Sequence, residues 1–351
     1  MFAEKIIDWY AEFGRRLPWR ETDNAYYIWL SEVILQQTRI EQGRGYYEHF
    51  LAKYPTVGDL AEASEEQVLK SWQGLGYYSR ARNLHAAARH IAFDLGGRFP
   101  DTYEGILSLK GVGRYTAAAV ASFAFGLPYP VIDGNVYRLI SRLYGIYTPI
   151  GTDKAYDEFE RLLLNLIDHE RPGLFNQAMM DFGSLYCRPI GCNCAECIFA
   201  EECFAHKRGV VDVLPVRPRP VEVRERYFYY IDMRWACQEP MVVMQQRVAG
   251  DIWQGLYELP LYEVERPIDE DELVLHLSEV VKGWVGEAPE RVVVGPSMTH
   301  RLTHRLIKAQ FVQAFFSNKP KEIPVKMRPV RLSEIKTLPI SRLIDRYLSK
   351  L

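Results

Sequence analysis

The chain has 351 residues, of which 48% are hydrophobic and 25% are charged. This composition excludes a disordered or fibrous chain, and the length allows two domains of ordinary size. The formal net charge of −2 argues mildly against a nucleic-acid partner, which favours a basic surface, although a local basic patch can coexist with acidic regions.

Residues 1–206 are predicted to be almost wholly helical, beginning with the amphipathic stretch MFAEKIIDWYAEFGRRLPW. The sequence contains no apolar run long enough to span a bilayer and no signal peptide, so we expect a cytoplasmic protein without membrane contact. The segment YYIWLSEVILQQ, residues 26–37, is apolar all round, which predicts a buried helix with Glu32 in its middle. A buried carboxylate is costly, so Glu32 is either a satisfied hydrogen-bonding residue or a functional acid.

The segment SLKGVGRYTAAAV, residues 108–120, places Gly111 and Gly113 directly before an alanine-rich run. Because glycine is unfavourable inside a helix, this pattern predicts a turn that opens a helix. The free amides at such a helix start can donate to a phosphate, and the helix dipole adds attraction. An ordinary helix–helix turn is the alternative, since short glycine motifs have little specificity.

Asp133 precedes another predicted helix, in PVIDGNVYRLISRLYG at residues 130–145. Its ordinary role is to cap that helix. A capping carboxylate is also rigidly held, so Asp133 is a second candidate for stabilising a cation.

Five of the six cysteines lie within residues 187–203. Without Cys192, their spacing is C-x6-C-x2-C-x5-C, and four thiolates can bind either zinc or an iron–sulfur cluster. Zinc sites tend to use two separated C-x2-C pairs, so one tight loop after a helix favours a cubane cluster. Buried free thiols are the remaining alternative.

The composition and the predicted secondary structure of the sequence change after this cysteine loop. Residues 210–226 contain Pro215, Pro218 and Pro220, which predicts an extended linker. Strand-like segments follow at 226–235, 240–248, 291–296 and 307–316, with predicted helices at 269–286 and 340–351. We therefore expect a helical domain at 1–209, a linker at 210–226 and an α+β domain at 227–351.

These motifs together resemble the helix-hairpin-helix DNA glycosylases that carry a [4Fe–4S] cluster. The resemblance is closest to the adenine DNA glycosylases of the MutY type, and it spans nearly the whole chain. It rests on LPWR (17–20), WLSEVILQQTR (29–39), GLGYYSRARNLH (74–85), VIDGNVYRL (131–139), FNQAMMDFG (175–183) and WQGLYELP (253–260).

The resemblance implies a mainly α catalytic region, with the helix-hairpin-helix fold in two helical lobes plus an iron–sulfur loop, followed by an α+β Nudix-like domain. That domain lacks an acidic helix of the REUxEE type, so it is expected to recognise 8-oxoguanine rather than hydrolyse a diphosphate. The implied partner is double-stranded DNA containing adenine opposite 8-oxoguanine or guanine. A monomer is expected, and no contact with a replication clamp is visible in the sequence.

The resemblance also implies roles for individual residues. Glu32 would be the general acid and Asp133 would stabilise an oxocarbenium-like sugar, helped by Tyr115 and Asn135. Bifunctional relatives carry a lysine where this chain has Tyr115, so base excision without a genuine lyase step is expected. The other implied positions are the adenine pocket (Trp19, Arg20, Gln177), the wedge and oxidised-guanine contacts (Gln37, Thr38, Leu75, Tyr77), the phosphate-binding hairpin (Gly111, Gly113) and the [4Fe–4S] ligands (Cys187, Cys194, Cys197, Cys203). A place in the hydrophobic core is the alternative for Leu75, Tyr77 and Tyr115.

Two departures from the family pattern are present. Lys110 replaces the usual hairpin proline, which removes stiffness but adds a charge beside the phosphate. The family's Phe-Ser-His loop reads Leu302-Thr303-His304, so Thr303 and His304 remain candidates for contacting 8-oxoguanine, while a polar surface loop is the alternative. Three rival functions are a bifunctional glycosylase for oxidised pyrimidines, a DNA-binding protein without activity and a zinc-dependent binding module.

Overall fold

The computed structural model describes residues 2–218, 223–237, 239–248 and 250–350. Its contacts divide the chain into two compact units, Met1–Glu62 with Asn83–Arg219 and Ala63–Arg82 with Pro220–Leu351. Residues 63–82 thus group with the C-terminal part of the chain, although the sequence suggests a boundary at 209. The predicted linker includes residues 219–222, which lie outside the described residues.

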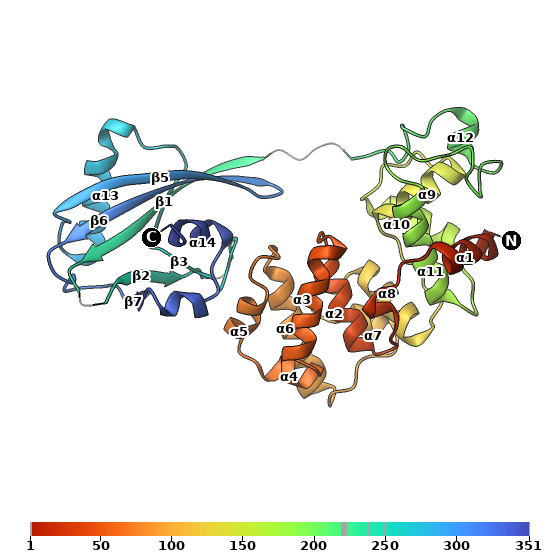
Figure 1. Cartoon of the computed structure of the whole chain (residues 1–351), viewed down its shortest axis with the longest axis horizontal. Helices are drawn as coiled ribbons and strands as arrows, with labels where there is room; N and C mark the ends of the chain where they lie inside the picture. The colour runs from red at the N-terminus through yellow and green to blue at the C-terminus, as the bar shows by residue number, and fades with distance from the viewer. Residues whose placement is uncertain (1, 219–222, 238, 249, 351) are drawn as a thin grey trace. The chain divides into compact units, whose positions relative to one another are not determined.

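All regular secondary structure in the described residues of the first unit is helical (Figure 1). Its helices are α1 (Phe2–Phe13), α2 (Ala25–Leu35), α3 (Ile40–Lys53), α4 (Val57–Glu62), α6 (Ser79–Arg89, which begins in the second unit), α7 (Tyr103–Leu107), α8 (Arg114–Phe125), α9 (Gly134–Tyr144), α10 (Asp153–Leu164), α11 (Pro172–Asp181) and α12 (Phe204–Arg208). A π-helical turn, Phe182–Tyr186, continues α11 toward the cysteine loop.

Helix α2 is buried on all sides, as its apolar sequence predicts. It begins where the side chain of Asn24 accepts hydrogen bonds from the amides of Tyr26 and Tyr27. It packs against α3 and α8, and the small residues Ala117–Ala119 of α8 are fully buried there. A second core joins α1, α9, α10 and α11 around Ile6, Val136, Phe159 and Phe175.

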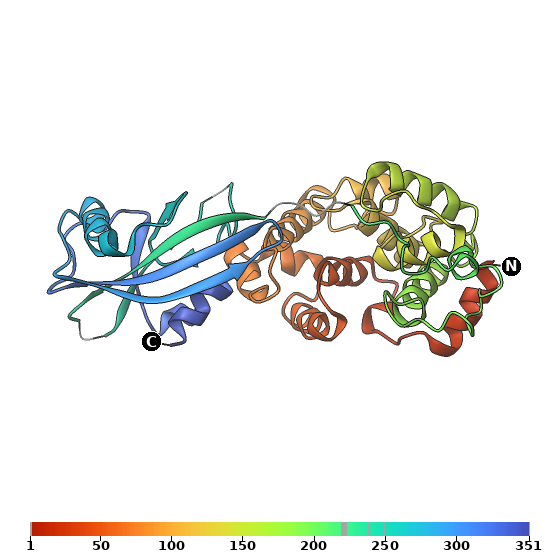
Figure 2. The same ribbon diagram turned by 90° about the horizontal axis from the view of Figure 1, so that it is seen from above.

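The second unit contains two sheets (Figures 1 and 2). One has the strand order β4-β1-β6-β5 and the other the order β3-β2-β7, and β1 and β6 run parallel. Their bounds are β1 (Arg224–Trp235), β2 (Met241–Gln246), β3 (Tyr257–Glu258), β4 (Leu261–Val264), β5 (Arg291–Arg301), β6 (Arg305–Phe316) and β7 (Met327–Arg331). Helices α5 (Glu65–Ser71), α13 (Glu270–Val285) and α14 (Arg342–Leu348) complete the unit.

The longer predicted elements of this unit are confirmed. Strands β1, β2, β5 and β6 and helices α13 and α14 lie where the sequence places them. The short strands β3, β4 and β7 are not predicted. Helix α13 packs on one face through Leu273, Leu277 and Val281, and α14 packs through Leu343 and Ile344 on another. Among the described residues, no helix is both long and apolar enough to cross a membrane.

Candidate active site

A cavity of about 200 Å³ lies within the first unit, where α2, α8, α9, the segment 15–20 and the end of α11 meet. Seven of the residues that the sequence nominates line this cavity: Trp19, Arg20, Glu32, Thr38, Tyr115, Asp133 and Asn135. The chain segments that supply them are more than a hundred residues apart at the extremes, and the fold brings them together. Arg15, Met180 and Ser184 also line the cavity and were not nominated.

Glu32 is buried, with 6% of its surface exposed. Its Oε2 accepts a hydrogen bond of 2.7 Å from the hydroxyl of Tyr115. Burial raises the pKa of Glu32 to about 7, although the Tyr115 hydrogen bond and the positive charge of Arg20 oppose that rise. Glu32 is therefore a carboxyl group that can hold a proton near neutral pH and release it into the cavity.

Asp133 caps α9 and faces the same cavity. Its Oδ1 accepts hydrogen bonds of 2.8 Å from the amides of Asn135 and Val136, and its Oδ2 accepts one of 2.7 Å from the Asn135 side chain. Burial raises the pKa of Asp133, and these hydrogen bonds oppose the rise by stabilising the carboxylate. The capping interpretation and the cavity interpretation are both compatible with this geometry.

Asn135 is itself held from behind by Arg138. Nη2 of Arg138 donates to Oδ1 of Asn135 at 2.9 Å and to the carbonyl of Gly183, while its Nε donates to the carbonyl of Cys187 at 2.8 Å. Gly183 lies so close that a Cβ atom there would be 2.7 Å from the carbonyl oxygen of Asn135. The cavity wall at Asn135 is therefore packed directly against the start of the cysteine loop.

Arg20 reaches the cavity from the irregular segment before α2. Its guanidinium forms a bidentate pair with Asp181, with two N–O distances of 2.9 Å. Gln177, nominated for the adenine pocket, is absent from the residues that line the cavity. Its Oε1 instead accepts a hydrogen bond of 2.9 Å from Tyr10, whose hydroxyl accepts one of 3.3 Å from Arg20.

The glycine hairpin is the turn between α7 and α8. Gly111 has a φ of +80°, and a Cβ atom there would lie 2.5 Å from Cβ of Asn83, so both backbone strain and close packing favour glycine. Gly113 is the N-cap of α8 and supplies no side-chain cap. No atom lies within 4 Å of a Cβ built on Gly113. Among the residues that the structure describes, the first amides of α8 therefore have no side-chain partner, and the turn has open space beside it.

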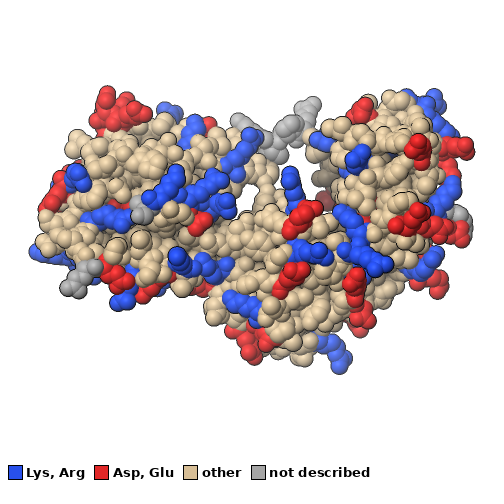
Figure 3. All heavy atoms as spheres, viewed as in Figure 1, with Lys and Arg blue, Asp and Glu red and all other residues tan. Residues whose placement is uncertain are grey.

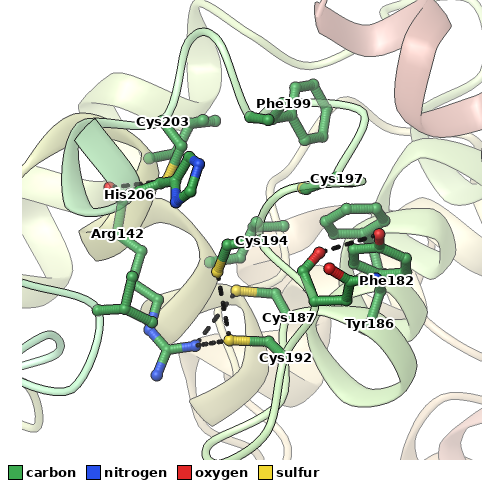
Figure 4. A pocket seen from close by; sticks show the side chains of 15 residues that line it. Arg142, Phe182, Tyr186, Cys187, Cys192, Cys194, Cys197, Phe199, Cys203 and His206 are labelled. Carbon is green, nitrogen blue, oxygen red and sulfur yellow. Dashed lines mark hydrogen bonds between the residues drawn. The ribbon is translucent and has the colours of Figure 1, made fainter. Parts of the chain in front are cut away.

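The five clustered cysteines line a second cavity of the first unit, walled by apolar residues such as Leu139 and Phe199 (Figure 4). Nη1 of Arg142 lies 3.5 Å from Sγ of Cys187 and 3.7 Å from Sγ of Cys192. Sγ of Cys192 is 3.5 Å from Sγ of Cys194. All five thiols are free, and no group of three or more His, Cys, Asp and Glu residues in the described ranges is arranged to hold a single metal ion.

Two nominated residues occupy strained backbone positions. Gln37 and Tyr77 have φ values of +55° and +45°, which residues other than glycine rarely adopt, and both side chains are exposed. Leu75, by contrast, is 7% exposed, which fits the core alternative for that residue. Sequence patterns gave no signal for this strain.

The nominated residues of the second unit lie around the tip of the β5–β6 hairpin. The hydroxyl of Tyr77 is 2.5 Å from Oγ1 of Thr303, and both residues line a cavity that also contains His304 and Trp253. Trp253, which was not nominated, has a φ of +58°, and its ring centroid lies 5.5 Å from that of His300. Basic side chains predominate on the face of this unit that Figure 3 shows, despite the net charge of −2.

Comparisons with known proteins agree with this architecture. Residues 30–167 match the HhH-GPD superfamily of base excision DNA repair proteins, and residues 234–350 match the NUDIX domain. A solved thermostable thymine-DNA glycosylase is 29% identical with a TM-score of 0.55, over 59% of this chain and 95% of that one. Endonuclease III trapped on DNA shares the fold, at 23% identity and a TM-score of 0.50 over 59% of this chain and 94% of that one.

Curated relatives from several organisms are all named adenine DNA glycosylase. The adenine DNA glycosylase of Buchnera aphidicola (subsp. Acyrthosiphon pisum) is 30% identical over 331 residues, which covers 92% of this chain and 91% of the relative. The human enzyme is 42% identical over 216 residues, covering 59% of this chain and 40% of its own length, and the mouse enzyme is 34% identical over 82% of this chain and 65% of its own. The chain therefore belongs to the adenine DNA glycosylase family of base excision repair enzymes.

Proposed function

We propose that the protein removes adenine mispaired with 8-oxoguanine or guanine in duplex DNA, by hydrolysis of the N-glycosidic bond. The observation that carries this proposal is the pair of carboxyl groups in one cavity. Glu32 has a pKa of about 7, whereas Asp133 accepts three hydrogen bonds that stabilise its charged form. In glycoside hydrolysis, two carboxyl groups in different environments usually take different roles: one donates a proton and the other stabilises positive charge.

In this mechanism, Glu32 protonates a ring nitrogen of adenine and makes the base a better leaving group. Positive charge then develops on the sugar, and the Asp133 carboxylate stabilises it, by charge or by transient attachment. Water then adds to the same sugar carbon and loses a proton, which completes the hydrolysis and leaves an abasic site. Tyr115 keeps the Glu32 carboxyl in position through its hydrogen bond, and Asn135 fixes Oδ2 of Asp133. A phenol cannot form a Schiff base, so Tyr115 supports excision without a lyase step.

The adenine must leave the base stack before it can reach Glu32. We place a DNA phosphate at the open start of α8, where the amides near Gly111 and Gly113 have no side-chain partner within the described part of the chain. Gln37 and Tyr77, exposed and strained, are the proposed wedges into the stack. Thr38, Trp19 and Arg20 line the cavity that would receive the base, and Gln177 is linked to that wall through Tyr10.

Recognition of 8-oxoguanine is assigned to the second unit. Tyr77 and Thr303 present hydroxyl groups to the same space, beside His304 and the aromatic Trp253. Hydroxyl and imidazole groups can donate to or accept from the oxidised edge of the base. Leu75 is the less favoured contact because it is buried.

The cysteine pocket fits an iron–sulfur cluster, because soft thiols converge in an apolar cavity beside one cationic side chain. Cys187, Cys194, Cys197 and Cys203 would hold the [4Fe–4S] group. When bound, such a cluster supplies a covalent cross-link to the loop and a one-electron redox centre. The excision steps above are performed by the side chains of the other cavity.

The test uses duplexes that carry adenine opposite 8-oxoguanine, guanine or cytosine, incubated with the purified protein and then treated with alkali. Excision opposite the two guanine-type bases but not opposite cytosine supports the proposal. A parallel borohydride trap should capture no covalent protein–DNA adduct, whereas a bifunctional enzyme would be trapped. Tight binding without excision would instead support the DNA-binding protein without activity.

The rate of excision should depend on the protonation of Glu32. Since the acid must carry its proton, the single-turnover rate is expected to fall as pH rises through about 7. The Tyr115 hydrogen bond lowers the pKa of Glu32, so Tyr115→Phe should move this fall to higher pH while slowing the reaction. A pH–rate profile measured from pH 5 to 9 on both proteins checks the direction, and an unmoved or opposite shift would contradict the assignment.

Removal of one cluster ligand should be visible without an activity assay. Cys197→Ser is expected to lower bound iron and the broad visible absorbance of the purified protein. Cys192→Ser is the matched control, because this thiol lies in the same pocket but outside the family spacing. Equal iron loss in the two variants would show that the ligand set has been assigned wrongly, and bound zinc would favour the binding module.

A further inference from the structure

We infer that Asp181 is a positioning residue for the adenine pocket: it anchors the segment that carries Arg15, Trp19 and Arg20 into the cavity. This inference rests on the proposed function, because it concerns the same cavity. Asp181 is the last residue of α11 and its side chain is fully buried. It does not line the cavity, so it acts through the residues that do.

Both oxygens of Asp181 are occupied by donors from one short segment. Arg20 forms the bidentate pair at 2.9 Å, and Arg15 donates through its backbone amide at 2.8 Å, its Nε at 3.0 Å and its Nη2. Burial alone would raise the pKa of Asp181, but these hydrogen bonds outweigh it and hold the pKa below its ordinary value. Asp181 is therefore charged at neutral pH and paired on both oxygens.

The anchored segment has little other regular structure. Between the end of α1 and the start of α2, only the short turn Pro18–Arg20 is helical. This segment nevertheless supplies Arg15, Leu17, Trp19 and Arg20 to the cavity wall. The ion pairs of Asp181 with Arg15 and Arg20, which we call the clamp, restrict the position of the cavity wall more strongly than loop packing would. The reason is that bidentate guanidinium–carboxylate pairs fix orientation as well as distance.

The clamp extends to a second side of the pocket. Arg20 donates to the hydroxyl of Tyr10 at 3.3 Å, and Tyr10 donates to Oε1 of Gln177 at 2.9 Å. Gln177 lies one helical turn before Asp181 on α11, so the hydrogen bonds form a closed path that starts and ends on that helix. Loss of Asp181 would remove the ion pair that holds Arg20. The hydrogen bonds from Arg20 to Tyr10 and from Tyr10 to Gln177 would then no longer be fixed in position.

Asp181→Asn preserves the size of the side chain but removes the charge and turns one acceptor into a donor that faces a guanidinium. We expect the single-turnover excision rate to fall about 10- to 100-fold, the usual scale for small displacements of catalytic geometry. The affinity for an uncleavable duplex should change little. Asp94→Asn is the matched control, since Asp94 is an exposed carboxylate of the same unit that pairs only with His90 among the described interactions.

A double-mutant cycle separates positioning from general destabilisation. If Asp181 acts through Arg20, then Asp181→Asn should slow an Arg20→Met protein by less than about threefold. Independent, multiplicative losses together with a normal affinity for DNA would overturn the inference. Asp181→Glu, which keeps the charge but shifts it, should give an intermediate rate and covers the case in which Asp181→Asn does not fold.

A readout without activity keeps this test separate from that of the proposed function. Nitrogen-15 NMR of arginine side chains, with Arg20 assigned by its absence in Arg20→Met, should show restricted Nη signals in the wild type that disappear in Asp181→Asn. Persistence of those signals would overturn the inference even in an active enzyme. A wild-type protein that excises no adenine, but shows the predicted loss of signals, would contradict the proposed function and leave the anchor established.

Discussion

Glu32→Gln is expected to reduce the single-turnover rate of adenine excision by about 10²- to 10⁴-fold, which is the usual contribution of a positioned general acid. Glutamine has nearly the same shape and can still accept the 2.7 Å hydrogen bond from Tyr115. It has no proton to give at any relevant pH. The variant should therefore bind the mispaired duplex as the wild type does and release adenine only at this reduced rate.

The same substitution has a second, thermodynamic consequence. Because the folded-state pKa of Glu32 is raised from 4.5 to about 7, the wild type has the full stability associated with this group only below about pH 4.5 and loses it as pH rises through 7. Glu32→Gln should remove that loss, which amounts to about 3 kcal/mol. Denaturant unfolding at pH 5 and pH 8 measures it. Wild-type excision activity in the variant would show that Glu32 is only a structural residue, and an unchanged pH dependence of its stability would show that the pKa of Glu32 is not raised.

Asp133→Asn is expected to lower the excision rate by about 10²- to 10³-fold, the scale of removing one fixed electrostatic partner of a transition state. The test is sharp because asparagine is as good an N-cap as aspartate. The amides of Asn135 and Val136 would still find an acceptor at the start of α9. The hydrogen bond from the Asn135 side chain to Oδ2 of Asp133 would be lost, so stability should fall by about 1 kcal/mol while the reaction slows far more.

Asp133→Ala provides the contrast. It removes both the cap and the charge, so it should add a further loss of about 1 kcal/mol in the free energy of unfolding to the same loss of rate. If Asp133→Asn retained the wild-type rate and only Asp133→Ala were impaired, Asp133 would be a helix cap and nothing more. Urea unfolding and single-turnover kinetics on the three proteins distinguish the two cases.

The sequence draws attention to these two residues for different reasons, and the family resemblance implies their catalytic roles. Glu32 interrupts an otherwise apolar helix, and Asp133 stands where a helix must begin. Such residues can be recognised from the sequence alone, because the surrounding pattern defines which residue type is expected at each position. The long strands and helices of the second unit can also be predicted, since hydrophobic periodicity over about ten residues is a strong signal. Strand β3 has only two residues, which are too few to show any periodicity.

Other parts of the site depend on contacts that no local pattern contains. Asp181 lies in FNQAMMDFG and reads as an ordinary residue near a helix end, yet its partners are Arg15 and Arg20, some 160 residues earlier. Gln177 was expected in the pocket, but the structure turns its amide oxygen toward Tyr10. The positive φ of Gln37 and of Trp253 is likewise not predictable from the sequence, because neither residue type favours that conformation by itself.

Gly183 bears no functional group, yet it touches Asn135 so closely that even a methyl group would displace the residue that holds Asp133. Mutational tolerance along the chain should therefore follow free space as well as chemistry. In a saturation library selected for repair, position 183 should accept glycine almost exclusively, while Gly45 of α3, with open space around it, should accept small residues. A reader of the sequence who ranks positions by reactive side chains would overlook the first of these glycines.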